Sequence, residues 1–365
     1  MGKENLEDVR KKINEIDKKM AELFVQRMEA SKEVASYKME HALPILDKER
    51  EQRVLSNNAS YVDDETIREY YVHFLKETME LSKAYQKRIM EKMIVGYSGV
   101  PGAFGYLAAK QMFPDATLVS YPDFLEAYQK CEAGECDAVV LPLENSFAGD
   151  VGAVMDLTFS GTLYINQMID LDVVHNLIGT KEASLDTIQE VYSHPQALAQ
   201  CADYINEHHF IPRECVNTAV AGLEVAKRND PSFAAIASMD TANLYGLKVI
   251  EKNINSSRNN TTRFAAFSRS ERLPSPNNKM GEHFILVFTV LNEAGALAKT
   301  LNIIGAHGFN MRNLKSRPMK KLMWSYYFFV ELDGNINSED GREMLKQLAT
   351  VCDRLKLVGT YRSHI

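Results

Sequence analysis

The sequence predicts a multidomain protein that joins an all-helical domain, an α/β domain and a small ferredoxin-like α+β domain. Apolar residues repeat every three or four positions near the N-terminus. Buried strands then alternate with helices, and the last segment has the order βαββαβ. A chain of 365 residues is also longer than one core usually supports. We expect domains at 1–92, 93–270 and 282–365, with a Ser/Pro/Asn-rich linker at 271–281.

Composition excludes several classes of function. The content of 45% hydrophobic and 25% charged residues is typical of a folded globular protein. A net charge of -7 argues against a nucleic-acid-binding protein, which needs a basic footprint. No apolar run approaches the ~20 residues that span a bilayer, and the charged N-terminus does not resemble a signal peptide. The five cysteines show no CxxC spacing, which favours free thiols in a reducing cytoplasm and no metal site.

The first domain should contain three helices. Leu6, Ile13 and Met20 belong to an apolar stripe that runs through residues 5–40, and no Gly or Pro interrupts this stretch. A second helix should start near Asp47, and a third should cover about 64–92. A lone helix as long as the first cannot bury its stripe, so it must pack on other helices, including those of another chain.

Polar residues share faces of these helices. Arg27 and Lys38 lie eleven residues apart, close to three turns, and so point the same way. Each such group could equally be a solvated face with salt bridges. Arg10 lies about 25 Å from Arg27 along a helix that rises ~1.5 Å per residue, so it could join the same site only from an antiparallel second chain. The other two helices carry similar groups: Asp47, Arg50 and Glu51 on the second, and Ser82 and Gln86 on the third.

Residues 5–90 resemble the all-helical chorismate mutase family, because the eight polar residues above jointly match its active-site pattern. The resemblance implies an intertwined dimer that rearranges chorismate to prephenate, a pericyclic reaction that needs orientation and charge stabilisation but no nucleophile. It implies the following roles: Arg10 and Arg27 bind the two carboxylates, Lys38 and Gln86 donate to the ether oxygen, Glu51 holds the ring hydroxyl, and Asp47, Arg50 and Ser82 support the site.

Four segments stand out in the α/β domain. GYSGVPGAFG is a Gly-rich turn that could bind an anion through backbone N–H groups or simply allow tight packing. LPLENSFAG follows an apolar strand, where open α/β sheets bind ligands, although an ordinary polar turn would look the same. NNTTRF could be the start of a strand. In SHPQALAQC, Ser193 and Gln196 fit a capping box with Pro195 in the first turn. His194 could shuttle a proton, but we expect it to have a positional role.

In this order and spacing the four segments resemble prephenate dehydratase. The resemblance implies two α/β lobes like those of periplasmic binding proteins, hinges near residues 170 and 246, and prephenate in the cleft. Thr262 would assist the departing hydroxyl, and Arg263 would bind a carboxylate or orient Thr262. No metal or coenzyme is implied. Val100, Ala103 and Gly105 depart from the family's early turn, so that loop would contact an anion only through its backbone. The implied site also includes Glu144, Asn145, Ser146, Ser193, Gln200, Thr218 and Phe264.

Residues 282–365 resemble the ACT domain, a regulatory module of amino-acid enzymes. The resemblance implies L-phenylalanine as effector and feedback inhibition; a purely structural dimerisation module is the alternative. Lys315 stands where the family commonly has Glu, which reverses a charge beside the implied site. That site comprises Gly295, Ala296 and Leu297 at a helix start, and Asn310, Ser316, Arg317 and Pro318 on the next strand.

Together the resemblances imply a cytoplasmic, bifunctional enzyme of phenylalanine biosynthesis that forms phenylpyruvate from chorismate by way of prephenate. It would be at least a homodimer, without membrane or nucleic-acid partners. Two other readings are a dehydratase that uses arogenate and has a purely structural helical domain, and a non-catalytic solute-binding protein. The sequence alone does not separate prephenate from arogenate.

Overall fold

The computed structural model describes residues 6–41, 43–256, 259–277, 281–319 and 325–362. The chain divides into two compact units, Met1–Met93 and Ile94–Ile365. Part of the predicted linker lies outside the described residues. Within the described residues, no helix is both long enough and apolar enough to span a bilayer.

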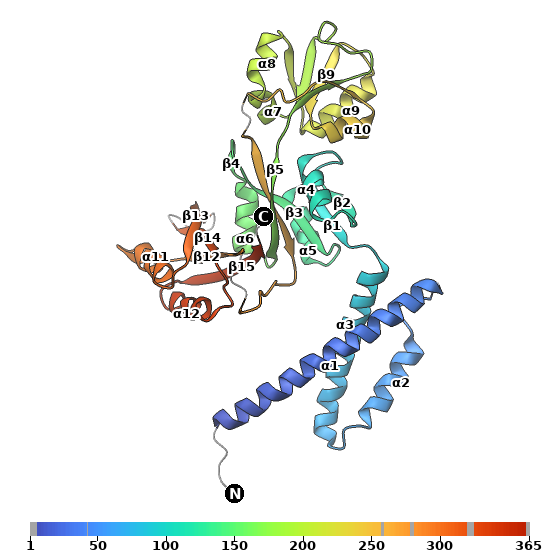
Figure 1. Ribbon diagram of the computed structural model, residues 1–365, viewed down its shortest axis with the longest axis vertical. Coiled ribbons are helices and arrows are strands. Elements are labelled where there is room, and N and C mark those ends of the chain that lie inside the picture. The colour runs from blue at the N-terminus through green and yellow to red at the C-terminus, as the bar shows by residue number, and fades with distance from the viewer. Residues whose placement is uncertain (1–5, 42, 257–258, 278–280, 320–324, 363–365) are drawn as a thin grey trace. The chain divides into compact units, whose positions relative to one another are not determined.

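The first unit consists of α1 (Leu6–Glu40), α2 (Lys48–Ala59) and α3 (Glu65–Met90), drawn in blue in Figure 1. The prediction of three helices is confirmed to within two residues at each described end. Asp47 and Asp64 cap α2 and α3, because their side chains accept hydrogen bonds from backbone N–H groups in the first turn. Both α1 and α2 pack on α3.

The apolar stripe of α1 remains largely exposed within one chain. Ile13, Ile16 and Leu23 are all more than half exposed. Only Ser31 and Ala35, near the C-terminal end of α1, are buried. The helix therefore has a long apolar surface that its own unit does not cover, as the sequence predicted.

The second unit begins with an α/β lobe, which we call the first lobe. Its sheet has the strand order β5-β11-β3-β1-β2, with β4 paired to β3. β11 runs antiparallel to both neighbours and returns from the far end of the chain. The elements are β1 (Ile94–Ser98), α4 (Phe104–Met112), β2 (Thr117–Tyr121), α5 (Phe124–Glu132), β3 (Ala138–Asn145), β4 (Gly149–Asp150), α6 (Gly152–Ser160), β5 (Tyr164–Asp172) and β11 (Thr261–Ser268).

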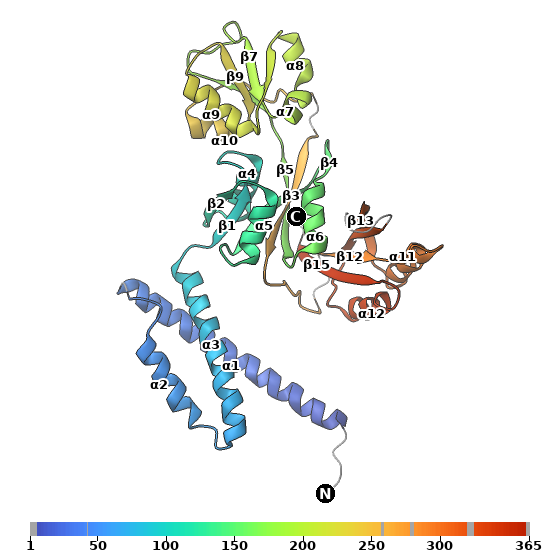
Figure 2. The same cartoon turned by 180° about the vertical axis from the view of Figure 1, so that it is seen from behind.

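The second lobe is inserted between β5 and β11, and Figure 2 shows β5 leading towards it. Its five-stranded sheet has the order β10-β6-β9-β7-β8. The elements are β6 (Asn176–Gly179), β7 (Glu190–Ser193), α7 (Pro195–Gln200), α8 (Ala202–Glu207), β8 (Ile211–Glu214), α9 (Thr218–Arg228), β9 (Phe233–Ala237), α10 (Met239–Tyr245) and β10 (Lys248–Glu251).

The two lobes are joined by residues 173–175 and 252–260. The first crossing lies close to the predicted hinge at 170. The predicted hinge at 246 is wrong, because Gly246 caps α10 inside the second lobe, and β10 then pairs with β6 before the chain leaves.

The C-terminal segment contains β12 (Glu282–Thr289), α11 (Ala296–Ala306), β13 (Asn310–Pro318), β14 (Tyr326–Asp333), α12 (Glu339–Leu348) and β15 (Arg354–Arg362). The predicted order βαββαβ is confirmed, with the strands arranged β13-β14-β12-β15. The helix α12 ends at Leu348, and after it Asp353 N–H bonds Thr289 O (3.0 Å) before β15 begins at the next residue.

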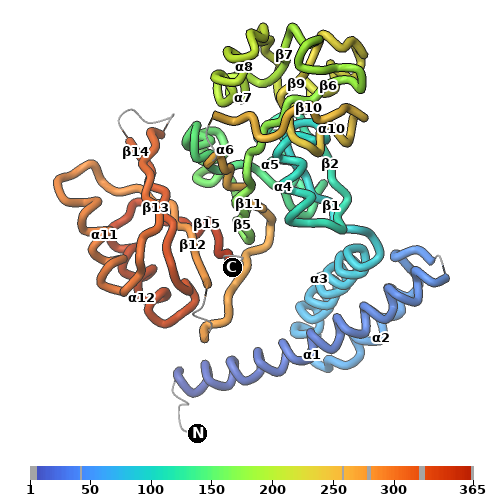
Figure 3. Tube along the Cα trace, turned by 45° about the horizontal axis from the view of Figure 1, so that its top comes forward, coloured from blue at the N-terminus to red at the C-terminus, as the bar shows by residue number. Residues whose placement is uncertain are grey.

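The sheet of the C-terminal segment continues into that of the first lobe, since β15 pairs with β5 at Gly359 and Ile165. A Cβ at Gly359 would lie 2.0 Å from Ile165 O, so only glycine permits this approach. One face of the four strands of this segment packs on α11 and α12 (Figure 3). The other face shares a core with α6 and the first lobe, including Val287, Phe329 and Met155.

Candidate active sites

In the first unit, Arg27 on α1 meets Ser82 on α3. Arg27 Nη1 donates to Ser82 Oγ and to Thr78 O, the latter at 3.3 Å. Ser82 is buried, and burial lowers the pKa of Arg27 below its ordinary value. The guanidinium is therefore held against α3 with its other N–H groups available for a ligand.

One helical turn further along α3, Lys38 approaches the buried Gln86. Lys38 Nζ lies 3.4 Å from Gln86 Oε1 and 2.6 Å from Ile45 O. Two of the three ammonium hydrogens are used in this way, and the third, which has no partner among the described residues, can bind a ligand. Because Gln86 accepts through Oε1, its Nε2 donors point elsewhere. The structure thus brings together four of the eight residues predicted for this site, namely Arg27, Lys38, Ser82 and Gln86.

The other predicted residues of the first unit have different surroundings. Glu51 forms an ion pair with Lys83 (2.9 Å) rather than with the four clustered residues. Asp47 caps α2 by accepting from Arg50 N–H (2.9 Å), which is a structural contact. Arg10 is exposed, and within the described part of the chain no hydrogen bond or ion pair joins it to the cluster.

In the second unit, a cavity of about 400 Å³ lies between the two lobes. Both lobes and the first connecting region, through Val173 and His175, contribute to its walls. Five of the residues predicted for the site are buried and line this cavity. The lining residues used below are Phe104, Asn145, Val173, His175, Gln196, Gln200, Thr218, Thr262 and Phe264.

Asn145 and Thr262 are directly opposite each other on β3 and β11. Asn145 Nδ2 donates to Thr262 Oγ1 at 2.8 Å. Asn145 Oδ1 accepts from the backbone N–H groups of Phe147 (3.0 Å) and Ala148 (2.8 Å). Since backbone N–H groups can only donate, these two bonds determine which end of the amide is oxygen and hence that Asn145 is a donor to Thr262.

Two predicted residues point away from the cavity because side chains alternate along a strand. Glu144 precedes Asn145 and forms an ion pair with Lys315 (2.8 Å). Arg263 follows Thr262 and pairs with Asp170 (2.9 Å) and Glu331 (3.3 Å). The hydrogen bond to Asp170 is the main cause of a raised pKa for Arg263.

Ser146 and Ser193 are also not among the lining residues. Ser146 Oγ donates to Asn259 O (2.7 Å), and Ser193 Oγ donates to Ile236 O (2.6 Å). The predicted capping box is wrong, because His194 is the N-cap of α7 and its Nδ1 accepts from Gln196 N–H (3.2 Å). Pro195 does occupy the first turn, whereas His194 both caps α7 and lines the cavity, so its positional role stays a prediction.

Two residues that the sequence analysis did not single out are bonded into this site. Asn260 Nδ2 donates to Gln200 Oε1 (2.9 Å), and Asn260 Oδ1 accepts from Asn145 Nδ2 (2.9 Å). His175 Nε2 lies 2.8 Å from the same Gln200 oxygen. Asn260 belongs to the NNTTRF segment itself, whereas His175 lies in an apolar run that carries no local signal.

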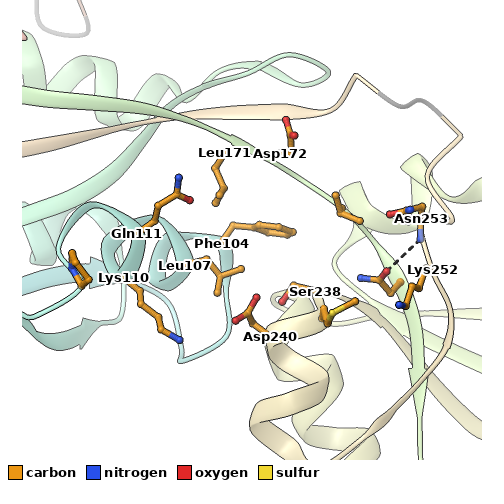
Figure 4. Close-up of a pocket in the computed structure, with 14 residues that line it drawn as sticks. Phe104, Leu107, Lys110, Gln111, Leu171, Asp172, Ser238, Asp240, Lys252 and Asn253 are labelled. Atoms are coloured by element: carbon orange, nitrogen blue, oxygen red, sulfur yellow. Dashed lines mark hydrogen bonds between the residues drawn. The ribbon is translucent and has the colours of Figure 1, made fainter. Parts of the chain in front are cut away.

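A larger cavity of about 650 Å³ lies on the other side of residues 171–176. Val173 and His175 line the smaller cavity, whereas Asp172, Val174 and Asn176 line the larger one, as expected for an extended segment with alternating side chains. Phe104 lines both. Figure 4 shows Lys110 and Asp240 reaching the larger cavity from opposite lobes.

Two family models match the chain, chorismate mutase type II over residues 9–87 and prephenate dehydratase over residues 95–272. A bifunctional chorismate mutase/prephenate dehydratase from Aquifex aeolicus is 30% identical over 367 residues, which cover 98% of each chain. The chain belongs to this bifunctional family.

Solved structures resemble the second unit of this family member. The prephenate dehydratase from Arthrobacter aurescens in complex with L-Phe is 26% identical with a TM-score of 0.69, over 74% of this chain and 90% of that one. GqqA, described as a quorum-quenching acylase, is 29% identical with a TM-score of 0.69, over 74% of this chain and 98% of that one.

The residues predicted to bind an effector in this bifunctional chain occupy two places in the C-terminal segment. Gly295 caps α11 in the left-handed region (φ 83°), and Ala296 and Leu297 begin that helix, as predicted. Asn310 Nδ2 donates to Asp333 Oδ2 (2.9 Å). Ser316, Arg317 and Pro318 end the edge strand β13.

That edge strand is bonded to the first lobe. Arg317 Nε donates to Asp156 Oδ1 (3.2 Å) on α6, and Lys315 pairs with Glu144 and Asp150. The lysine that stands in place of the family's glutamate therefore joins the C-terminal segment to the end of the strand that carries Asn145.

Proposed function

We propose that the chain is a bifunctional enzyme of L-phenylalanine biosynthesis. Its first unit rearranges chorismate to prephenate, and its second unit converts prephenate to phenylpyruvate. The observation that carries the proposal is the presence of two separate clusters of buried polar groups, one around Lys38 and Gln86 and one around Asn145 and Thr262. Both lie in segments that match the corresponding family models.

The cluster of the first unit suits an ether-linked dicarboxylate. Arg27 offers a planar fork to one carboxylate. Lys38 retains one ammonium hydrogen and Gln86 retains its Nε2 donors, so both can bind the ether oxygen where negative charge develops as the C–O bond breaks. Glu51 would hold the ring hydroxyl, with Asp47, Arg50 and Ser82 in support.

A second chain would complete this site. The exposed apolar stripe of α1 supports an antiparallel homodimer, in which Arg10 of one chain reaches the cluster of the other and binds the second carboxylate. We therefore propose a dimer as the smallest active form of the mutase.

The pair of Asn145 and Thr262 suits loss of a hydroxyl. Because Asn145 donates to Thr262 Oγ1, the hydroxyl hydrogen of Thr262 is left to donate to the departing hydroxyl. As the bond to the ring carboxylate breaks, its electron pair enters the ring, CO₂ leaves, and the C–O bond opposite breaks. The hydroxyl takes up a proton, which the solvent supplies by way of Thr262, and leaves as water, and the ring becomes aromatic. Gln200, Thr218 and Phe264 would bind the substrate.

We further propose that residues 1–92 and 93–270 are the mutase and dehydratase domains, that 271–281 is a linker, and that 282–365 is an ACT domain regulated by L-phenylalanine. The strand order β13-β14-β12-β15 of the C-terminal segment supports the assignment of this segment as an ACT domain. The ligand named for the Arthrobacter dehydratase supports the effector. Gly295 to Leu297, Asn310 and Ser316 to Pro318 would bind it. All five cysteines are free, which supports a cytoplasmic location.

The test supplies chorismate, prephenate and arogenate separately and follows each product by absorbance. Lys38→Ala should abolish prephenate formation while phenylpyruvate still forms from supplied prephenate. Thr262→Ala should do the reverse, so that prephenate accumulates from chorismate. Calorimetric unfolding of each full-length variant is the control for folding of the unit that carries the substitution, because the two activities lie in separate compact units. Parental rates in either variant would contradict the assigned site, and turnover of arogenate without prephenate would favour the alternative substrate.

A further inference from the structure

Buried side chains form a continuous hydrogen-bonded chain below the dehydratase cavity. It runs from Thr262 through Asn145 and Asn260 to Gln200 and ends at His175, with donor–acceptor distances of 2.8, 2.9, 2.9 and 2.8 Å. Each of these residues is at most 8% exposed. A buried network of this kind stabilises the fold when every donor faces an acceptor, and it is strongly destabilised when one side chain turns so that its donor and acceptor exchange places.

The position of each hydrogen follows from the backbone at one end. The N–H groups of Phe147 and Ala148 require Asn145 Oδ1 to accept, so Asn145 Nδ2 donates to Thr262 and Asn260. Asn260 Oδ1 then accepts, and its Nδ2 must donate to Gln200 Oε1.

The same reasoning extends to the last two members. Gln200 Oε1 accepts from Asn260, so His175 Nε2 must carry a hydrogen in order to bond to the same oxygen. His175 Nδ1 and Gln200 Nε2 have no partner among the described residues, although both atoms are buried. Since Oε1 of Gln200 is held twice, its Nε2 hydrogens are left as donors for a ligand in the cavity that Gln200 lines.

We propose that Asn260 and His175 are positioning residues of the dehydratase reaction. Both donate hydrogen bonds to Gln200 Oε1, so that the Nε2 hydrogens of Gln200 bind an oxygen of the substrate. Asn145 meanwhile keeps its hydrogen bond to Thr262. The inference rests on the proposed dehydratase activity. Asn260 links the two halves, because it takes one amide hydrogen of Asn145 and leaves the other for Thr262.

An isosteric substitution separates this role from simple packing. In Asn260→Asp, the new carboxylate can still accept from Asn145 but cannot donate to Gln200. The Gln200 amide must turn over to donate to it, which removes the Nε2 hydrogens from the substrate and forces the His175 proton from Nε2 to Nδ1. Loss of oriented donors to a charged substrate should lower kcat/KM on prephenate about 10–100-fold.

Two further variants test the ends of the chain. Gln200→Glu keeps an acceptor for both Asn260 and His175 but lacks the Nε2 donors, so turnover should fall while His175 keeps its Nε2 hydrogen. His175→Gln can still donate to Gln200 and should retain most activity, whereas His175→Leu cannot and should lose about as much as Asn260→Asp. Such rescue by a donor of different shape would not follow from a role in packing alone.

The readouts are prephenate kinetics and ¹⁵N NMR of the histidine ring in the full-length chain, with the His175 signal assigned by its loss in His175→Gln. Calorimetric unfolding of the second unit serves as a folding control. Parental kcat/KM in Asn260→Asp, or an unchanged Nε2–H tautomer there, would overturn the proposal. The His175 tautomer is measured without substrate and therefore does not depend on the proposed function. A parent enzyme that is inactive on prephenate would refute the proposed function, and the NMR spectra would still test the hydrogen-bond chain.

Discussion

Replacing Arg263 distinguishes a residue that binds substrate from one that joins two parts of the fold. Arg263 contacts Asp170 on β5 and the buried Glu331 on β14, and it does not line the dehydratase cavity. We expect Arg263→Met to destabilise the second unit and to change KM for prephenate by less than about threefold. A substrate-binding arginine would show the opposite pattern, because loss of a contact to a carboxylate raises KM without lowering stability.

The magnitude follows from the surroundings of Glu331. Its side chain is 2% exposed, and removing one partner of a buried ion pair costs about 3–5 kcal/mol. Tyr361 and Arg312 also contact Glu331, and Arg263 itself is 28% exposed, so we expect the smaller cost of about 2–3 kcal/mol. At about 2–4 °C per kcal/mol for a unit of this size, the melting temperature should fall by about 5–10 °C.

The assay is calorimetric unfolding of the full chain together with prephenate kinetics. Arg263→Lys is the matched control, because it keeps the charge but cannot reach two carboxylates at once, and should show an intermediate loss. A double-mutant cycle with Glu331→Gln should give a coupling energy of about 1–3 kcal/mol. An unchanged melting temperature with a tenfold higher KM would show that Arg263 binds substrate and that the reasoning is wrong.

Three further predictions concern the dimer, the pH dependence and Lys315. Ile16→Arg on the exposed stripe of α1 should weaken dimerisation at least ~100-fold and abolish mutase activity; a fully active dimer in light scattering would contradict the proposed interface. Burial lowers the pKa of His175 from 6.5, so the unfolded chain binds a proton at a higher pH than the folded one; the second unit should lose stability as pH falls through about 6.5 and not above it. His175→Gln should reduce that dependence in unfolding measured from pH 8 to 5, leaving the contribution of His194, whose pKa burial also lowers. Lys315→Glu should cost about 1–2 kcal/mol more in thermal unfolding than Lys315→Met, because it places like charges beside Glu144 and Asp150; equal losses would show that the ion pairs contribute little.

The elements that depend on local pattern were predictable. The three helices of the first unit follow from apolar spacing, and Asp47 and Asp64 follow from cap preferences. Two of the site errors could also have been avoided from the sequence. Once Asn145 and Thr262 are placed in a cavity, the two-residue period of a strand directs their neighbours Glu144 and Arg263 to the opposite face.

Other features depend on partners that are distant in the chain. Ser193 matches a capping box, but its hydroxyl donates to Ile236 O on β9, which no local pattern reveals. The second hinge was misplaced because β10 returns to pair with β6. His175 belongs to the site only because the fold brings it to Gln200, which lies 25 residues further along the chain.

The continuity of β15 with β5 limits how this chain can be cut into working pieces. A fragment that ends at residue 281 would lose the strand beside Ile165, uncover apolar side chains around Met155, and leave Arg263 without Glu331. Such a fragment should be prone to self-association. A cut near residue 93 falls between compact units and disturbs neither core. Biochemists who want the dehydratase alone should therefore retain everything that follows this point.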